Sequence, residues 1–145
     1  MKTVRVIATV ALAFLSITAI WGANLLMQDP TGRPMDIPVS LLQHSPFHSF
    51  FIPGIILLVS NGLLPLAFTV ATAFRKLPYG RWIAFQGCVL FGWISIEVIM
   101  LREVVWLHYV YWGLALVLVA CGWALHRHEA HAPAPALKTV AASRH

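Results

Sequence analysis

Charged side chains are scarce in this chain. Asp, Glu, Lys and Arg together make up 10% of its 145 residues, whereas hydrophobic residues make up 59%. A soluble globular domain carries about a quarter charged residues, so too few are present here to cover a water-facing surface. The composition therefore predicts a membrane protein whose main solvent is lipid.

Cysteine pairs and catalytic motifs are also missing. The two cysteines, Cys88 and Cys121, are not spaced as a CxxC pair and fall within long apolar runs, which argues against a disulfide framework or a zinc site. The sequence holds no CxxCH, no HExxH, no nucleotide-binding loop and no serine-nucleophile motif. It therefore offers no catalytic residue, no metal ligand set and no cofactor to predict.

Four apolar runs are long enough to cross a bilayer, whose hydrocarbon core of about 30 Å needs about 20 helical residues. They cover residues 6–27, 50–74, 82–101 and 104–125. We therefore expect an all-α membrane protein with one domain, residues 1–125, in which four transmembrane helices form a bundle. Small residues allow close helix packing. The glycines expected at such contacts are Gly87, Gly92, Gly113 and Gly122.

Basic residues predict the orientation. Those on the side of the two termini and of the connection between the second and third runs are Lys2, Arg5, Arg75, Lys76, Arg81, Arg127, Lys138 and Arg144. Arg33 and Arg102 fall on the other side. The positive-inside rule then gives an N-in/C-in orientation, with both termini in the cytoplasm. Because the net charge of +5 gathers at the ends of apolar runs, nucleic acid is not an expected partner.

Residues 126–145 form a histidine-rich segment with an Ala-Pro repeat. Such a composition buries too little apolar surface to fold, so a disordered cytoplasmic tail is expected. The expected partner is the lipid bilayer, and a homo-oligomer or another membrane subunit is left open.

The first connection and the second run contain turn and helix-breaking signals. The connection opens with DPTGRP and continues with IPVSLLQ, which is expected to lie along the membrane interface. Ser45-Pro46 has the pattern of an N-cap followed by proline, so the second helix is expected to start there. Pro65, close to Asn61, predicts a kink. Asn61 is expected to bond across a helix pair, and the alternative is a ligand or ion site at a broken helix.

The segment WISIEVIMLREVVWLHYVYWG, residues 93–113, carries two residues that are out of place in apolar runs, Glu97 and His108. Each lies five residues from the Arg102-Glu103 turn, about 7 Å along its helix, so antiparallel helices place both at the same depth. We expect a polar layer near the outer face. Its expected members are Glu97 and His108 with Asn24 and His48, while Asn61 lies deeper.

Glu97 is expected to face the bundle, because Gln86, Leu90 and Trp93 share its helix face. In the leading hypothesis Glu97 and His108 bond to each other as a structural clamp without catalysis. One alternative is a redox or proton-handling component (haem, quinone or cation) that uses Glu97, with His48 and His108 as haem ligands. The other is an enzyme whose Glu/His pair acts on a lipid-soluble substrate.

Two stretches resemble a known group of proteins. DPTG with SPFHSFFIPGIILLVSNGL, and the hairpin WISIEVIM…WLHYVYWG, resemble an uncharacterised group of small bacterial membrane proteins. The resemblance implies four helices and no known activity. The group's usual wording has glutamines where this chain has Glu97 and His108. Because glutamine bonds across helices but neither relays protons nor ligates haem, the resemblance favours the clamp.

Overall fold

The computed structural model describes residues 1–74 and 79–131, and within these residues the chain is helical with no strand. The elements in chain order are α1 (Lys2–Gln28), η1 (Arg33–Met35), η2 (Val39–His44), α2 (Phe51–Leu57), η3 (Leu58–Leu63), α3 (Leu64–Phe74), α4 (Tyr79–Leu101) and α5 (Trp106–His131). Two of them, η1 and η2, are 3₁₀ helices. In contrast, η3 is a π-helix that joins α2 and α3 into one interrupted helix.

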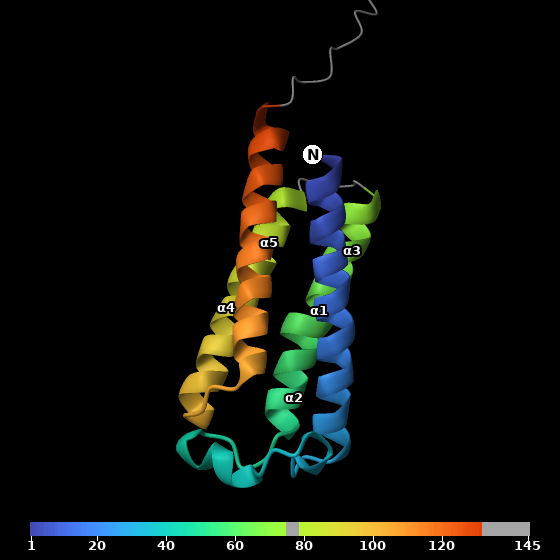
Figure 1. The fold of residues 1–145 in the computed structure, drawn as a ribbon. Helices are drawn as coiled ribbons and strands as arrows, with labels where there is room; N and C mark the ends of the chain where they lie inside the picture. Colours follow the sequence, from blue (N-terminus) through green and yellow to red (C-terminus); the bar gives the residue numbers. More distant parts are fainter. Residues whose placement is uncertain (75–78, 132–145) are drawn as a thin grey trace, which may run out of the picture.

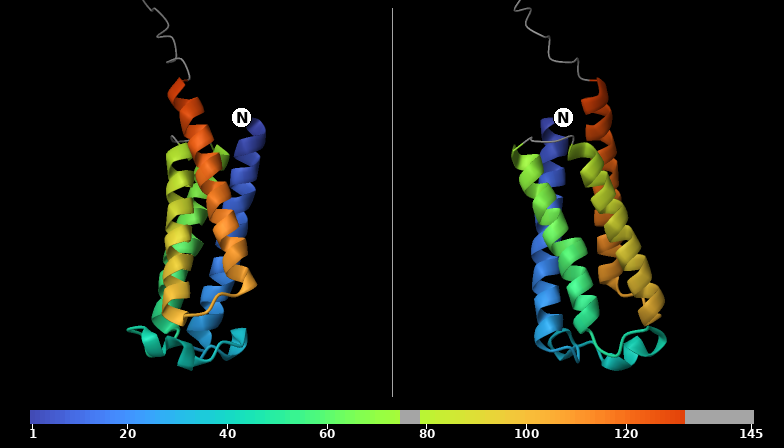
Figure 2. Two further views of the ribbon diagram at one scale, coloured as in Figure 1. Left: turned by 60° about the vertical axis from the view of Figure 1, so that its left-hand side comes forward. Right: turned by 180° about the vertical axis from the view of Figure 1, so that it is seen from behind.

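Four helical segments are long and apolar enough to cross a membrane: α1, the joined α2–η3–α3, α4 and α5. The predicted all-α class with four such helices is thereby confirmed. The start of α1 and the end of α5 lie at one end of the bundle, here called the terminus end (Figure 1). Figure 2 shows the connection of residues 29–50 across the opposite end, here called the loop end.

The end of α5 differs from the prediction. The helix continues to His131, so the expectation of a disordered tail from residue 126 is wrong at this boundary. The added turn is held against α4, because the Gly80 N–H donates to Glu129 Oε1 at 3.4 Å. Residues 132–145, and Arg75 and Lys76 of the connection before α4, lie outside the described residues.

The hairpin of α4 and α5 makes the most extensive helix contact in the bundle. A β-carbon on Gly80, Gly87 or Gly122 would run into backbone atoms of the facing helix, so glycine is what permits this approach. Gly87 and Gly122 were predicted contact points, and Gly80 is an additional one. The prediction is wrong for Gly92 and Gly113, because a β-carbon at either position would meet no atom of a neighbouring helix within 4 Å. Both lie about half a helical turn from the buried stripes.

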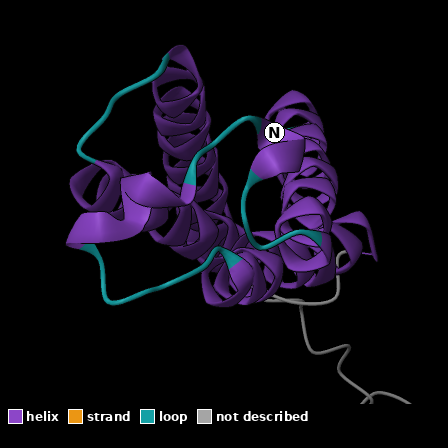
Figure 3. Ribbon diagram, turned by 90° about the horizontal axis from the view of Figure 1, so that it is seen from below, coloured by secondary structure: helices purple, strands orange, loops and turns teal. Residues whose placement is uncertain are grey.

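A small apolar cluster closes the loop end, where the 3₁₀ helices lie across the bundle (Figure 3). Leu42 of η2 is buried there against Leu26 and Phe50, so the IPVSLLQ segment does pack on the helices. The second long helix starts at Phe51, so the predicted start at Ser45-Pro46 is wrong. The Ser45 hydroxyl donates to the Leu42 carbonyl at 2.9 Å and therefore ends η2 rather than capping α2.

The preceding DPTG turn is held by Asp29. Its carboxylate accepts hydrogen bonds from the hydroxyl and the backbone N–H of Thr31. These bonds favour the ionised form and hold the pKa of Asp29 below its usual value. Gly32 completes the turn at a φ of 79°, a conformation that glycine adopts without strain.

Gly122→Ala is expected to push α4 and α5 apart, because the new β-carbon would meet the backbone of Ala84. Overpacking of this kind costs roughly 1–3 kcal/mol. Gly113→Ala is the matched control on the same helix, and it should be neutral or stabilising by up to about 1 kcal/mol because alanine favours helix. Thermal unfolding of both variants in detergent, followed by circular dichroism, measures the difference. Equal melting temperatures would contradict the close backbone contact.

Candidate functional site

The interruption in the second long helix has a covalent cause. The Leu64 N–H bonds to the carbonyl of Val59, five residues earlier, which is the π-helical spacing. In the same register the Ser60 carbonyl would need the N–H of residue 65. That residue is Pro65, which has none. The Ser60 carbonyl is therefore left inside the bundle without a main-chain donor.

Gln86 of α4 supplies the missing donor. Its Nε2 donates to the Ser60 carbonyl at 3.0 Å and lies 3.3 Å from Asn61 Oδ1. Asn61 in turn donates through Nδ2 to the Ser60 hydroxyl at 3.0 Å. The side chains of Gln86 and Asn61 are both 0% exposed. The predicted bond of Asn61 across a helix pair is therefore confirmed, and its partner is Gln86.

The third long helix in this contact is α1. The Ser16 hydroxyl is buried and donates to the Gly62 carbonyl at 2.8 Å. Ser16, Asn61 and Gln86, which are buried, and Ser60, which is partly buried, thus form one group of polar residues, here called the mid-helix network. It connects α1, η3 and α4 close to the middle of α1 and of the joined helix.

One atom of the mid-helix network has no partner. Gln86 Oε1 is buried and accepts no hydrogen bond from any residue that the structure describes. A buried acceptor left unpaired costs about 1–3 kcal/mol, which reduces the net benefit of the glutamine. The helical period of the sequence predicted that Gln86 faces the bundle, but it predicted no hydrogen-bond partner for this residue. The sequence signal that would have identified Gln86 is Pro65, five residues after Ser60. Because proline has no N–H, the Ser60 carbonyl requires a donor from another helix.

The predicted polar layer at the loop end is only partly present. Glu97 continues the inward stripe of Leu90 and Ile94 and is partly buried, and His108 is 6% exposed. The two do not bond to each other. Instead His108 Nδ1 accepts a hydrogen bond from the Val105 N–H at 2.9 Å. His108, the third residue of α5, thereby caps the N–H of Val105 just before the helix, the position that Glu or Gln takes in a capping box.

Asn24 and His48 do not join this layer, so that prediction is wrong. Asn24 is exposed, and its Oδ1 accepts from Gln28 Nε2 on the same helix at 3.1 Å. It lies next to the buried Ala23, and one residue turns a helical side chain by about 100°. His48 is exposed in the connection, because α2 begins only at Phe51. There it borders a hollow of about 250 Å³ formed by the connection itself.

Apolar residues separate the mid-helix network from Glu97. Along α4, Gln86 and Glu97 are about 16 Å apart at 1.5 Å per residue. The inward positions between them are Leu90 and Ile94, which are almost fully buried. Apart from the indole of the partly buried Trp93, no polar side chain stands between the two levels on this face of α4. The geometry of α4 therefore does not provide a continuous path for protons.

A metal or haem site finds little support in these residues. Among residues 1–74 and 79–131, no group of three or more His, Cys, Asp or Glu side chains is arranged to hold a metal ion. The proposed haem ligands His48 and His108 lie in an exposed loop and on a buried helix face. Comparisons with known protein families, with curated proteins and with solved structures found no match.

The bond between Gln86 and the Ser60 carbonyl gives a sharp prediction. Gln86→Leu should destabilise the protein, because it leaves the carbonyl freed by Pro65 without a donor, at a cost of about 1–3 kcal/mol. In the Pro65→Ala background, the new N–H can serve that carbonyl. There Gln86→Leu should be neutral or stabilising, since it also removes the unpaired Oε1.

The measurement is a double-mutant cycle on thermal unfolding in detergent, in which contacting residues show coupling energies of roughly 0.5–3 kcal/mol. Gln43→Leu, at an exposed position of η2, is the control for the chemical change itself. Additive effects of Gln86→Leu and Pro65→Ala would mean that Gln86 does not serve the carbonyl.

Proposed function

We propose that the chain is an integral protein of a bacterial inner membrane, with its terminus end in the cytoplasm. The four long apolar helices support the membrane location. Lys2, Arg5 and Arg127 at the terminus end support the orientation, because basic residues are retained on the cytoplasmic side. We also propose that the chain belongs to the group of small bacterial membrane proteins that it resembles, a proposal supported by the SPF…IPG…NGL pattern of residues 45–63.

Within that membrane we infer a structural role without catalysis. The observation that carries this proposal is the mid-helix network, in which every hydroxyl and amide group except Gln86 Oε1 bonds to the backbone of α2 or η3 or to another side chain of the network. Groups used in this way hold the bundle together and are not free to act on a substrate. The clamp proposed between Glu97 and His108 is thus replaced by one between Gln86, Asn61 and Ser16.

The enzyme alternative has less support. Two hollows on the described part of the chain are lined by residues of α1 and α5, and by residues of the connection. Neither is lined by Glu97 or His108. A lipid-soluble substrate would need a hollow beside an acid–base pair.

The orientation is tested by single-cysteine labelling in intact cells, in a Cys88→Ser, Cys121→Ser background. A cysteine introduced at exposed Gln43 of the connection should react with a membrane-impermeant maleimide. A cysteine at exposed Arg127 near the end of α5 should react only after the membrane is opened. Both positions are exposed in the fold, so accessibility differs only by the side of the membrane. The reverse labelling pattern would overturn the orientation.

A second candidate function is proton or cation handling by Glu97, and one observation favours it. Glu97 is partly buried within a long apolar helix and makes no hydrogen bond or ion pair to any described residue. Ionisable residues at such positions are expensive, at about 2.5–3.5 kcal/mol on insertion scales, and are commonly functional. A carboxylate without a structural partner is available to bind a proton or a cation.

Glu97→Gln tests whether Glu97 has a structural partner and whether it handles protons. If Glu97 has no structural partner, the neutral variant should unfold at a temperature equal to or higher than that of the unchanged protein. Combined with His108→Leu, which removes the cap and should cost about 0.5–2 kcal/mol, the effects should add within about 0.5 kcal/mol. A loss of stability in Glu97→Gln, with strong coupling to His108, would restore the clamp between these two residues. Proton uptake into vesicles that disappears only in Glu97→Gln would support the second candidate.

A further inference from the structure

Glu97 lies between two apolar clusters along α4. Helical residues three and four positions apart share a face. On the face of Glu97 these neighbours are Trp93, Ile94, Met100 and Leu101. Trp93 and Ile94 belong to the core cluster that α4 shares with α1 and α5, whereas Met100 and Leu101 pack against the cluster at the loop end. The carboxyl group therefore has apolar packing toward both ends of the bundle.

The cluster at the loop end is the thinner of the two barriers. It is formed by the connection of residues 29–50, whose 3₁₀ helix η2 contacts α4. Leu42 of η2 and Phe50 are buried in this cluster, against which Met100 and Leu101 pack. These two residues of α4 lie only about 4–6 Å beyond Glu97 along the helix axis. One layer of apolar side chains thus separates the carboxyl group from the loop end.

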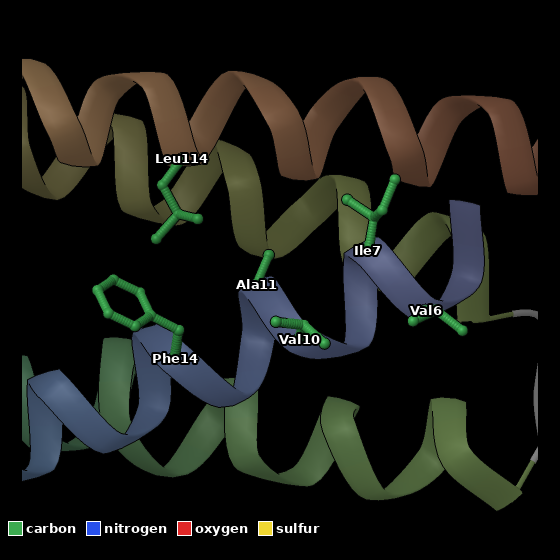
Figure 4. A pocket seen from close by; sticks show the side chains of 6 residues that line it. All are labelled: Val6, Ile7, Val10, Ala11, Phe14 and Leu114. Atoms are coloured by element: carbon green, nitrogen blue, oxygen red, sulfur yellow. The ribbon is translucent and has the colours of Figure 1, made fainter. Parts of the chain in front are cut away.

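The route from the terminus end is longer and apolar. On α4 it passes Leu90 and Ile94, which are almost fully buried. The apolar groove between α1 and α5, of about 410 Å³, offers no hydrated route either, because every lining side chain is hydrocarbon (Figure 4). These residues are Val6, Ile7, Val10, Ala11, Phe14 and Leu114. Water therefore reaches Glu97 at lower cost through the cluster at the loop end.

The surroundings of Glu97 suit a proton better than a metal cation. A hard cation takes several oxygen ligands. Ser95 carries the hydroxyl closest to Glu97 in the sequence of α4, but it donates to the Phe91 carbonyl at 2.7 Å and lies 3.3 Å from Trp112 Nε1. Within the described residues, Glu97 belongs to no group of three or more potential metal ligands. A proton, by contrast, needs only the carboxylate itself.

The other titratable groups near this end do not pair with Glu97. Residues 6–28 of α1, and α2 with η3, carry none. On α5, His108 is buried with its Nδ1 bonded to the Val105 N–H, and Tyr109 is exposed. The remaining groups lie in η2 and the turns of the loop end: Asp29, Arg33, Asp36, His44, His48, Arg102 and Glu103. Because Glu97 bonds to none of them, its ionised form depends on water for stabilisation.

We propose that Glu97 binds a proton, and that loss of this proton displaces η2 from the end of α4 so that water enters from the loop end. The inference rests on the second candidate function given above, and it adds the identity of the ligand and the side of access. While Glu97 is a neutral acid, the apolar cluster packs over it at little cost. A carboxylate needs hydration there, and the layer of Leu42, Met100 and Leu101 is the thinnest barrier to water. Low pH thus closes the loop end, and high pH opens it.

The test measures the distance between two spin labels in the full chain in detergent. The labels are attached to cysteines introduced at exposed Gln43 of η2 and exposed Ile99 of α4, in a Cys88→Ser, Cys121→Ser background. A population with a longer distance should grow from about pH 5 to about pH 9, a range in which buried glutamic acids titrate. For one linked proton, the ratio of open to closed molecules rises by at most about tenfold per pH unit. Labels at Ile99 and exposed Ala120, on α4 and α5, should show no change.

Matched variants assign the response to Glu97. Glu97→Gln should keep the short distance at every pH, whereas Glu103→Gln and His44→Gln, at exposed positions of the loop end, should respond as the unchanged chain does. A distance that does not depend on pH, an undiminished response in Glu97→Gln, or loss of the response in either control would overturn the proposal. The same opening caused by sodium or calcium ions at constant pH would assign the site to a metal cation and overturn the proton.

The outcome is separable from that of the second candidate function. Proton uptake into vesicles that depends on Glu97, without any movement of η2, would overturn the proposed access route and leave the candidate function standing. Absence of both the uptake and the movement would reject both.

Discussion

The packing at the middle of this bundle depends on one missing backbone N–H, that of Pro65. Pro65 leaves the Ser60 carbonyl without a donor, in a place where lipid offers none. The helix responds by adopting π-helical spacing, and Gln86 reaches across from α4 to serve the carbonyl at 3.0 Å. Ser16 does the same for the Gly62 carbonyl from α1. Three long helices are thereby brought into a fixed register around one interruption, and the bundle gains polar contacts that lipid does not compete for.

The other strong constraint is the contact between α4 and α5. Gly80, Gly87 and Gly122 let the two backbones approach until a single methyl group would not fit. In a membrane, where apolar side chains gain little by leaving lipid for one another, such close backbone packing is a main source of helix association. The hairpin of α4 and α5 and the interrupted helix then meet through Gln86. The loop end, by comparison, is closed by a few apolar residues around Leu42 and Phe50.

This arrangement separates the polar residues into two kinds. Those at mid-depth are bonded to backbone groups and act as structural ties, whereas Glu97 lies beyond Leu90 and Ile94 and bonds to no residue that the structure describes. A structural role and a protonatable site are therefore compatible within one small bundle. The groove between α1 and α5 adds a third feature on the lipid-facing surface, and it is independent of both.

The sequence alone determined the number of long helices, because runs of about 20 apolar residues have few alternatives in lipid. It also identified the interruption near Pro65 and the inward face of α4, because both follow from covalent geometry and helical period. Only the tertiary structure decided which polar groups meet. Glu97 and His108 share a depth, yet the imidazole bonds to the nearer Val105 N–H. Likewise Asn24 lies one position from the buried stripe and therefore points away from the bundle. Depth follows from sequence spacing, but partnership depends on the rotation of each helix about its axis, which packing sets.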